Sequence, residues 1–280
     1  MNYTGDKTFD RTLTVAVAIT LYLLRLAKYQ SRAQYGKFGA GKNIVNLEAR
    51  LGWWLMELPA TVSFLYNYYR GRQRKLQKEK EHPEEQKKGP NGWATRILFL
   101  VWCLHYGNRG WFFPLTIRTA KGSKESFALY NAAIGAMFLS VHGYLNGRLF
   151  SELGTRYTDA WLKDPRFIIG LATYLTGFVI TVHSESVIRN LRPANGIVPP
   201  GERYKIPYGG MFKYVTNPAY LGELTAWTGF IILTWSPTLW PALFITAANL
   251  VPRSFEQHKW YLKKFPDYPK DRTALIPFLL

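Results

Sequence analysis

Apolar residues along the chain are gathered into long blocks separated by polar segments. Seven blocks hold few charged residues and cover residues 12–26, 51–69, 97–117, 127–150, 167–183, 220–235 and 239–251. Most approach the roughly 20 apolar residues that a helix needs to cross a bilayer, although three are shorter. A surface helix of a soluble protein would carry polar residues every few positions. We therefore predict an all-α, polytopic integral membrane protein with about seven transmembrane helices, forming a single domain over residues 1–280.

The first block resembles a signal peptide in length, but no small-x-small cleavage site follows it. Lys28, Tyr29 and Gln30 come next, so we expect an uncleaved span. If the chain alternates sides, the side with the carboxyl terminus holds somewhat more Lys and Arg, which favours a cytosolic carboxyl terminus. We expect a multi-pass protein of a bacterial inner membrane or the endoplasmic reticulum, and the short loops favour bacteria.

Composition limits the partners. Lys and Arg number 36 against 18 Asp and Glu, a net charge of +18 that suggests nucleic acid, an anionic membrane surface or a phosphorylated ligand. The basic residues are divided between both membrane faces, which makes a poor footprint for nucleic acid, so we expect none. Residues 70–89 are highly charged and helix-prone, and we predict a solvated extension there. We expect a monomer in the lipid bilayer.

Ordinary catalytic motifs are weak or missing. Residues 36–43 nearly spell a phosphate-binding P-loop, but Asn43 stands where a Ser or Thr should hold Mg²⁺, and we predict a flexible basic loop. No GxGxxG follows a strand, so a dinucleotide would bind outside a Rossmann domain. Cys103 is the only cysteine and the five His lack metal-ligand spacing, so we expect no metal and no internal disulfide.

Ionisable side chains inside apolar blocks are costly and are therefore candidates for function. Glu57 is the deepest of them, two residues before Pro59 in the second block. Unpaired burial favours its neutral acid form, which is a proton donor. The alternative is an ion pair with an interior arginine, and Arg25, Arg109 and Arg148 are the candidates.

The third block holds a second polar group. Tyr106 offers a hydroxyl that can hydrogen-bond a carboxylic acid or a ligand oxygen. His105 and Arg109 share a neighbouring helical face because they are four residues apart. A tyrosine in a helical membrane protein can equally serve packing alone.

Three polar stripes at helical spacing lie in the carboxyl-terminal half, at Glu185, Arg189 and Arg192, at Tyr220, Glu223 and Trp227, and at Arg253, Gln257 and Tyr261. Two stripes carry arginine, whose planar guanidinium suits phosphate, and the aromatic rings suit a nucleobase or nicotinamide. Arginines that reach lipid headgroups are the alternative. Together the stripes favour a cofactor with phosphate groups.

These residues resemble the steroid 5α-reductase family. The resemblance is dense over residues 164–280 and thins upstream to islands at Glu57-Leu58-Pro59 and His105-Tyr106. Its strongest motifs are His183-Ser184-Glu185, Arg189-Asn190-Leu191-Arg192, Ile206 to Val215, Tyr220-Leu221-Gly222-Glu223 with Trp227, Trp260 to Phe265, Asp267 to Lys270 and Ala274-Leu275-Ile276-Pro277-Phe278.

The resemblance implies a seven-helix membrane reductase that uses NADPH to saturate the 4,5 double bond of a 3-oxo-4-ene steroid. It implies that Glu57 and Tyr106 are catalytic and grip the 3-oxo group of the substrate. The expected cofactor-binding residues are Arg118, Glu185, Asn190, Arg192, Tyr220, Glu223, Arg253 and Tyr261. The expected substrate pocket adds Trp53, Met56 and Trp227.

Some residues depart from the family pattern. Met56 stands where animal relatives have Gln. Gln257 replaces a His of the family pattern, and an Asn is replaced at both Ala219 and Thr181. Met56 keeps open the reduction of another lipid enone or enoyl substrate, such as a polyprenol or an enoyl thioester. A membrane methyltransferase that binds S-adenosylmethionine is a further alternative, as is a lipid-binding protein without catalysis.

Overall fold

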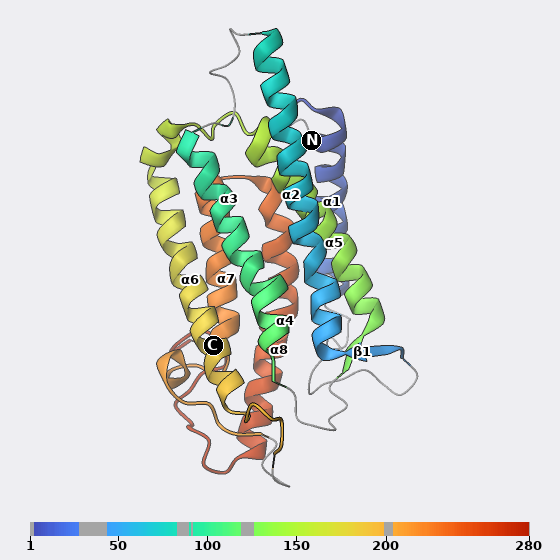
Figure 1. The fold of residues 1–280 in the computed structure, drawn as a ribbon. Helices are drawn as coiled ribbons and strands as arrows, with labels where there is room; N and C mark the ends of the chain where they lie inside the picture. The colour runs from blue at the N-terminus through green and yellow to red at the C-terminus, as the bar shows by residue number, and fades with distance from the viewer. Residues whose placement is uncertain are drawn as a thin grey trace.

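The protein is almost entirely helical (Figure 1). The structure, a computed structural model, describes residues 3–27, 44–82, 90, 92–118, 126–198 and 204–279. The P-loop-like segment 36–43 lies outside these residues. The long helices are α1 (Lys7–Ala27), α2 (Ala49–Glu81), α3 (Gly92–Tyr106), α5 (Leu129–Arg148), α6 (Pro165–Asn190), α7 (Pro218–Thr234) and α8 (Trp240–Lys264). Each apolar block falls on one of these helices and its continuation, which confirms the all-α prediction.

The third apolar block forms a helix with an irregular middle. After α3, Gly107–Phe112 adopt a π-helix, and α4 (Phe113–Thr116) follows directly. A π-helical segment shifts the register of the side chains that follow it, and such segments occur frequently at functional sites. The irregular stretch includes Arg109.

Two three-residue strands were not expected from the sequence. β1 (Asn46–Glu48) pairs antiparallel with β2 (Ser126–Ala128), so that Leu47 lies opposite Phe127. The pair joins the segments that lead into α2 and α5 (Figure 1). Strands this short are decided by their neighbours in space, so a periodic pattern in the sequence does not reveal them.

Two helix pairs approach so closely that glycine is required between them. In the α6–α7 pair, a Cβ atom on Gly177 would meet the backbone of Ala226, and one on Gly229 would meet the backbone of Tyr174. In the α2–α5 pair, Gly143 lies against the backbone of α2 in the same way. Close contacts through small residues are typical of helices that pack inside membranes.

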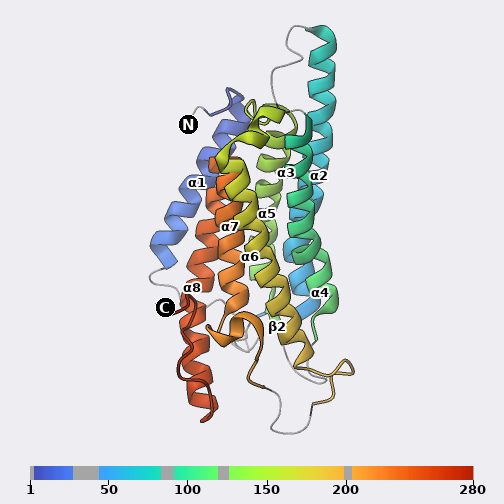
Figure 2. The same cartoon turned by 90° about the vertical axis from the view of Figure 1, so that its left-hand side faces the viewer.

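The two ends of the bundle differ in shape. α2 projects beyond the other helices at the end near the amino terminus, and α8 projects at the opposite end (Figure 1 and Figure 2). The projecting part of α2 is the start of segment 70–89, where we expected a solvated extension. The expectation fails for Lys75, which is 7% exposed and donates a hydrogen bond to the carbonyl oxygen of Pro90. A lysine buries its ammonium group only when such an acceptor satisfies it.

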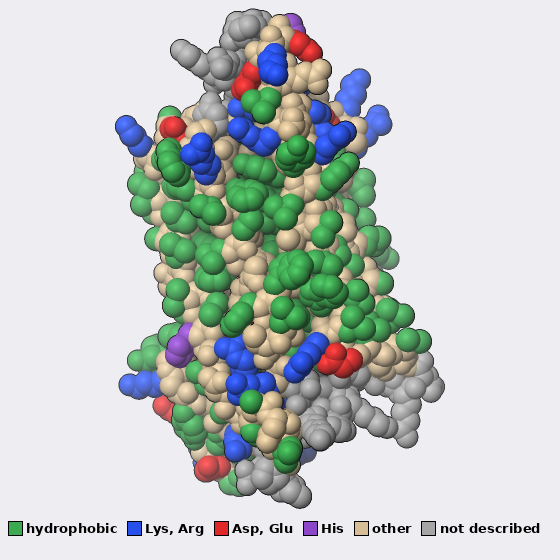
Figure 3. Space-filling view, in the orientation of Figure 1, with side chains coloured by type: hydrophobic (Ala, Val, Ile, Leu, Met, Phe, Trp, Pro, Cys, Tyr) green, Lys and Arg blue, Asp and Glu red, His purple; other side chains and the backbone are tan. Residues whose placement is uncertain are grey.

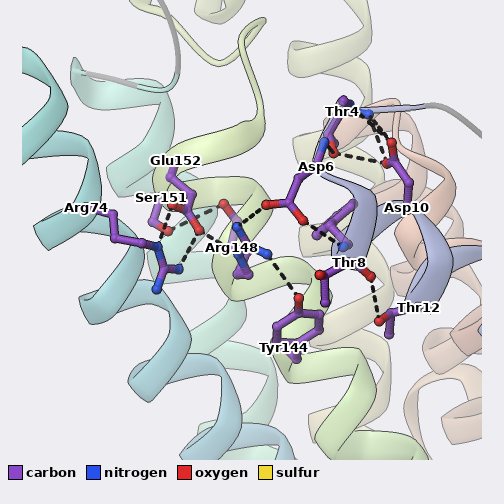
Figure 4. A network of polar contacts seen from close by, with 12 residues as sticks. Thr4, Asp6, Thr8, Asp10, Thr12, Arg74, Tyr144, Arg148, Ser151 and Glu152 are labelled. Atoms are coloured by element: carbon purple, nitrogen blue, oxygen red, sulfur yellow. Dashed lines mark hydrogen bonds and ion pairs between the residues drawn. The ribbon is translucent and has the colours of Figure 1, made fainter. Parts of the chain in front are cut away.

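A charged network ties three segments together at the amino-terminal end (Figure 4). The Arg148 guanidinium lies 2.8 Å from the Asp6 carboxylate and 2.6 Å from Glu152. Glu152 also accepts a hydrogen bond of 2.8 Å from Nε of Arg74 on α2. The hydrogen bond from Arg148 lowers the pKa of Asp6. Burial acts to raise the pKa of Glu152, but the hydrogen bonds from Arg74 and Arg148 outweigh it and leave that pKa lowered.

The surface is divided into bands. Hydrophobic side chains cover the middle of the face seen in Figure 3, and Lys and Arg gather towards both ends. Among the described helices, α6 alone is both long and apolar enough to cross a membrane by length and composition, with a mean hydropathy of 1.6 over its best window. Large apolar side chains on α1, α5 and α6 are also exposed, among them Ile19, Met137 and Val179.

Candidate active site

A cavity of about 1460 Å³ runs through the half of the bundle that lies towards the end of α6 and the carboxyl-terminal part of α8. Residues from all seven long helices line it, since even α1 contributes Leu23 and Leu24. A typical site for one small ligand occupies roughly 300–1000 Å³. The cavity is therefore large enough for two ligands side by side.

The structure brings almost all of the predicted site residues to this cavity. The lining includes Trp53, Met56, Glu57, Tyr106, Arg118, Glu185, Arg192, Tyr220, Glu223, Trp227, Arg253 and Tyr261. Asn190 is the exception, because it is exposed at the last position of α6 and does not line the cavity. Arg192 lies beyond the end of α6, so it reaches the cavity from the following turn and not from a helical stripe.

Arg109 is the centre of the polar end of the cavity. Its guanidinium lies 3.3 Å from the carboxylate of Glu57, 3.6 Å from that of Glu185 and 3.7 Å from that of Glu223. It also lies over the ring of Trp53, with its central carbon 5.0 Å from the ring centroid. Of the three arginines considered as partners for Glu57, Arg109 is the one that pairs with it.

The charge balance of this cluster has a chemical consequence. Glu57, Glu185 and Glu223 come from α2, α6 and α7, and all three carboxylates surround one guanidinium. Three ionised carboxylates would leave excess negative charge in a buried site, which is costly. A proton retained on Glu57 would lower this cost. Contact with Arg109 and proton donation by Glu57 are therefore compatible, because the neutral acid can still accept a hydrogen bond from the guanidinium.

Tyr106 lies beside this cluster in an aromatic setting. Its side chain is 1% exposed, with ring centroids of Trp102 at 4.8 Å and Trp227 at 6.5 Å. Its hydroxyl has no hydrogen-bond partner among the residues that the structure describes. A buried hydroxyl without a partner is costly, which marks it as a group suited to a ligand atom.

Three further arginines, Arg118, Arg192 and Arg253, line the cavity. Arg118 donates to the carbonyl oxygen of Arg192 at 2.9 Å, and Arg192 donates to that of Arg118 at 2.7 Å. This exchange joins the end of α4 to the turn after α6. On the other wall, Arg253 and Gln257 of α8 both donate to the hydroxyl oxygen of Tyr220, at 3.1 and 2.9 Å.

Tyr261 closes the α8 stripe. It is buried, and its ring stacks on Tyr268 with centroids 5.1 Å apart. Burial raises the pKa of Tyr261 to about 12, so it stays a neutral phenol in the physiological range. Arginine guanidinium groups that line a cavity beside aromatic rings provide donors for phosphate and a stacking surface for planar rings.

The sequence did not reveal the roles of two residues at the site, Arg109 and Asn131. Arg109 was considered only as one of three partners for Glu57, yet it contacts three carboxylates from three helices. An arginine within an apolar block was the available signal. Asn131 lines the cavity, and its amide nitrogen has no partner among the described residues. Nothing in the local sequence around Asn131 distinguishes it from a packing residue.

Comparison with known proteins gives a consistent result. Residues 125–280 match the family model described as 3-oxo-5-alpha-steroid 4-dehydrogenase. The chain is 36% identical over 251 residues to 3-oxo-5-alpha-steroid 4-dehydrogenase 1 of Homo sapiens, covering 89% of this chain and 87% of that protein. It is 33% identical to 3-oxo-5-alpha-steroid 4-dehydrogenase 2 of Homo sapiens, covering 96% and 94% of the two chains. A steroid 5-alpha-reductase of Solanum lycopersicum is 38% identical over 65% of this chain and 68% of its own length. The chain therefore belongs to the 3-oxo-5-alpha-steroid 4-dehydrogenase family.

Proposed function

We propose that the protein is a membrane-embedded, NADPH-dependent reductase that saturates the 4,5 double bond of 3-oxo-4-ene steroids. One observation carries the proposal. A single large cavity joins a buried acid and hydroxyl, Glu57 and Tyr106, to a mouth lined by arginines and aromatic rings. This arrangement can hold a carbonyl oxygen at one end and a phosphate-bearing cofactor at the other.

The inner end of the cavity suits the carbonyl chemistry. Reduction of a conjugated enone places negative charge on the carbonyl oxygen, far from the carbon that receives the hydride. The Tyr106 hydroxyl and a proton held on Glu57 are donors on buried side chains, where they stabilise such charge strongly. Arg109 keeps Glu57 in place, because its guanidinium lies 3.3 Å from a carboxyl oxygen that can accept from it even when the acid is protonated.

The outer end suits NADPH. When bound, NADPH would supply the hydride, and this chain must orient it and hold its phosphates. Arg118, Arg192 and Arg253 line the cavity where phosphate would lie, and guanidinium groups bind phosphate with two parallel hydrogen bonds. Trp227 lines the cavity, with its ring centroid 6.5 Å from that of Tyr106, and a nicotinamide ring could stack on it.

The surface supports the membrane part of the proposal. A central apolar belt with basic residues at both ends matches a bilayer with its charged headgroups (Figure 3). Exposed apolar side chains on α1, α5 and α6, and the glycine contacts between helices, point the same way. In this arrangement the arginine-lined mouth and the carboxyl terminus lie together at the cytosolic end.

A different lipid enone is the second candidate substrate. Met56 lines the cavity next to Glu57, and a Cβ atom on Gly135 of α5 would collide with its side chain. The wall beside the acid is therefore apolar and tightly packed at this point. An unbranched enoyl chain would fit such a wall as well as a steroid ring does.

The test is NADPH oxidation by detergent-purified protein with and without progesterone, with the products analysed by mass spectrometry. We expect an NADPH-dependent product that is two mass units heavier than progesterone. NADPH binding without turnover would move the search to other lipid enones. A folded sample that binds no NADPH would contradict the proposal and favour the methyltransferase alternative.

A further inference from the structure

A chain of buried hydrogen bonds lies behind the aromatic wall of the cavity. His142 and Asn146 of α5 are 2% and 0% exposed, and Ser236 and Thr238 in the α7–α8 connection are equally buried. Thr238 donates from Oγ1 to Oδ1 of Asn146 at 2.8 Å, and Nδ2 of Asn146 lies 3.3 Å from Nδ1 of His142. None of these four residues lines the large cavity.

This series of hydrogen bonds determines which ring nitrogen of His142 carries the proton. Nδ2 of Asn146 also donates to the His142 carbonyl oxygen at 2.9 Å, and a carbonyl can only accept. Together with the Thr238 contact, this sets which end of the Asn146 amide is nitrogen. Because that nitrogen is a donor, Nδ1 of His142 is an acceptor, and the neutral ring carries its proton on Nε2.

Directionality strengthens this donor. The Thr238 hydroxyl gives its proton to Asn146, so the Ser236 hydroxyl, 2.9 Å away, donates to Thr238. Every proton in the series therefore points towards His142. Hydrogen bonds in such a series polarise one another, and donation to Nδ1 makes the Nε2–H group a better donor.

The His142 ring, which carries this Nε2–H group, packs among the same aromatic rings as Tyr106. Rings of Trp102, Phe138, Trp227 and Tyr106 surround the imidazole, with centroids 4.8, 6.2, 5.5 and 6.2 Å away. Among the described residues, Nε2 of His142 has no hydrogen-bond partner, and neither has the hydroxyl of Tyr106. The indole N–H groups of Trp102 and Trp227 have no partner there either, but His142 is the one of these three donors that a buried hydrogen-bond series polarises.

We propose that His142 is a positioning residue for Tyr106: in the substrate-loaded site, its Nε2–H group donates to the Tyr106 hydroxyl oxygen, directly or through one water molecule. This inference rests on the proposed function, in which Tyr106 donates its own proton to the substrate carbonyl. The hydrogen bond from His142 orients the hydroxyl and makes its proton easier to share. The Ser236–Thr238–Asn146 series holds the imidazole in the form that can do so.

Substitution of His142 separates this role from packing. His142→Phe keeps an aromatic ring among the four neighbouring rings and removes the N–H donor. Loss of a hydrogen bond of ordinary strength should lower kcat of this variant about 3- to 10-fold and change KM less than about twofold. His142→Gln restores an N–H donor and should recover most of the lost turnover.

A double-mutant cycle with Tyr106→Phe decides the question. If His142 acts through the Tyr106 hydroxyl, His142→Phe should have no further effect on kcat once that hydroxyl is gone. Equal effects in both backgrounds would overturn the proposal, as would wild-type kcat in His142→Phe. If His142→Phe does not fold, Thr238→Val, which releases Asn146, replaces it in the same cycle.

The protonation site can be measured without turnover. Selective ¹⁵N labelling of the five histidines distinguishes a protonated Nε2 from a protonated Nδ1, with the His142→Phe or Thr238→Val spectrum used for assignment. A proton on Nδ1 of His142 would overturn the proposal even if the enzyme is active. If wild-type protein reduces no enone while the Nε2–H form is observed, the proposed function has failed and the positioning role fails with it.

Discussion

Removal of the Tyr106 hydroxyl should separate stability from activity. The hydroxyl is buried and has no hydrogen-bond partner among the described residues, so Tyr106→Phe breaks no hydrogen bond with them. Leaving a buried polar group unsatisfied costs about 1–3 kcal/mol, and the substitution relieves part of that cost. We expect the free energy of unfolding to stay unchanged or to rise by up to about 1 kcal/mol.

Activity should move in the opposite direction. In the proposed reaction, the same hydroxyl donates to the oxygen on which negative charge develops. Removal of one such donor lowers kcat by about 10²–10³. Because Tyr106 is not among the residues proposed to hold the cofactor, the Kd for NADPH should change less than about threefold, well below 1.4 kcal/mol.

Tyr174→Phe is the matched control. The Tyr174 hydroxyl is buried too, but it donates to the carbonyl oxygen of Val101 at 3.2 Å and does not line the cavity. Its loss should lower the free energy of unfolding by about 0.5–1.5 kcal/mol and leave kcat near the wild-type value.

Thermal unfolding in detergent measures the stability of both variants, and steady-state NADPH oxidation with progesterone measures their kcat. A Tyr106→Phe variant with kcat within threefold of wild type would refute the role of this hydroxyl. A variant that loses as much stability as Tyr174→Phe would show that the hydroxyl has a structural partner in the folded protein.

Three other substitutions test the acid, the charged network and the helix packing. Glu57→Gln should lower kcat about 10²-fold while NADPH still binds, and wild-type turnover would contradict the acid role. Arg148 lowers the pKa of Asp6 below its ordinary 3.8, so the stability that Asp6 contributes is present above pH 3.8 and is lost as pH falls through the lower, folded-state value. Asp6→Asn should therefore lower Tm at pH 7 and reduce the further fall of Tm in acid, and an unchanged pH profile would argue against this. Gly229→Leu should prevent the α6–α7 contact, a loss above about 4 kcal/mol seen as aggregation in gel filtration, whereas Gly107→Ala, whose Cβ atom meets nothing within 4 Å, should elute as wild type.

Much of the fold follows from local patterns in the chain. Apolar blocks of helical length are properties of neighbouring residues, and all seven became helices. Helix ends depend on contacts beyond the block and were less certain. α6 ends at Asn190, which leaves that side chain exposed and carries Arg192 into a turn.

The site shows the same division between local and distant information. Spacing along α7 and α8 placed Glu223 and Arg253 on polar stripes, and both line the cavity. The sequence offered Glu57 three possible arginines, and only the packed bundle selects Arg109.

The sequence by itself determined the helical class, the family and most of the residues that line the cavity, because hydrophobic periodicity and motif spacing are written along the chain. Tertiary structure alone decided that Glu57, Glu185 and Glu223 share Arg109, and that His142 and Tyr106 present unpartnered polar groups on neighbouring rings. These relations join residues on different helices. Their energies depend on distance and burial in three dimensions, which no local pattern contains.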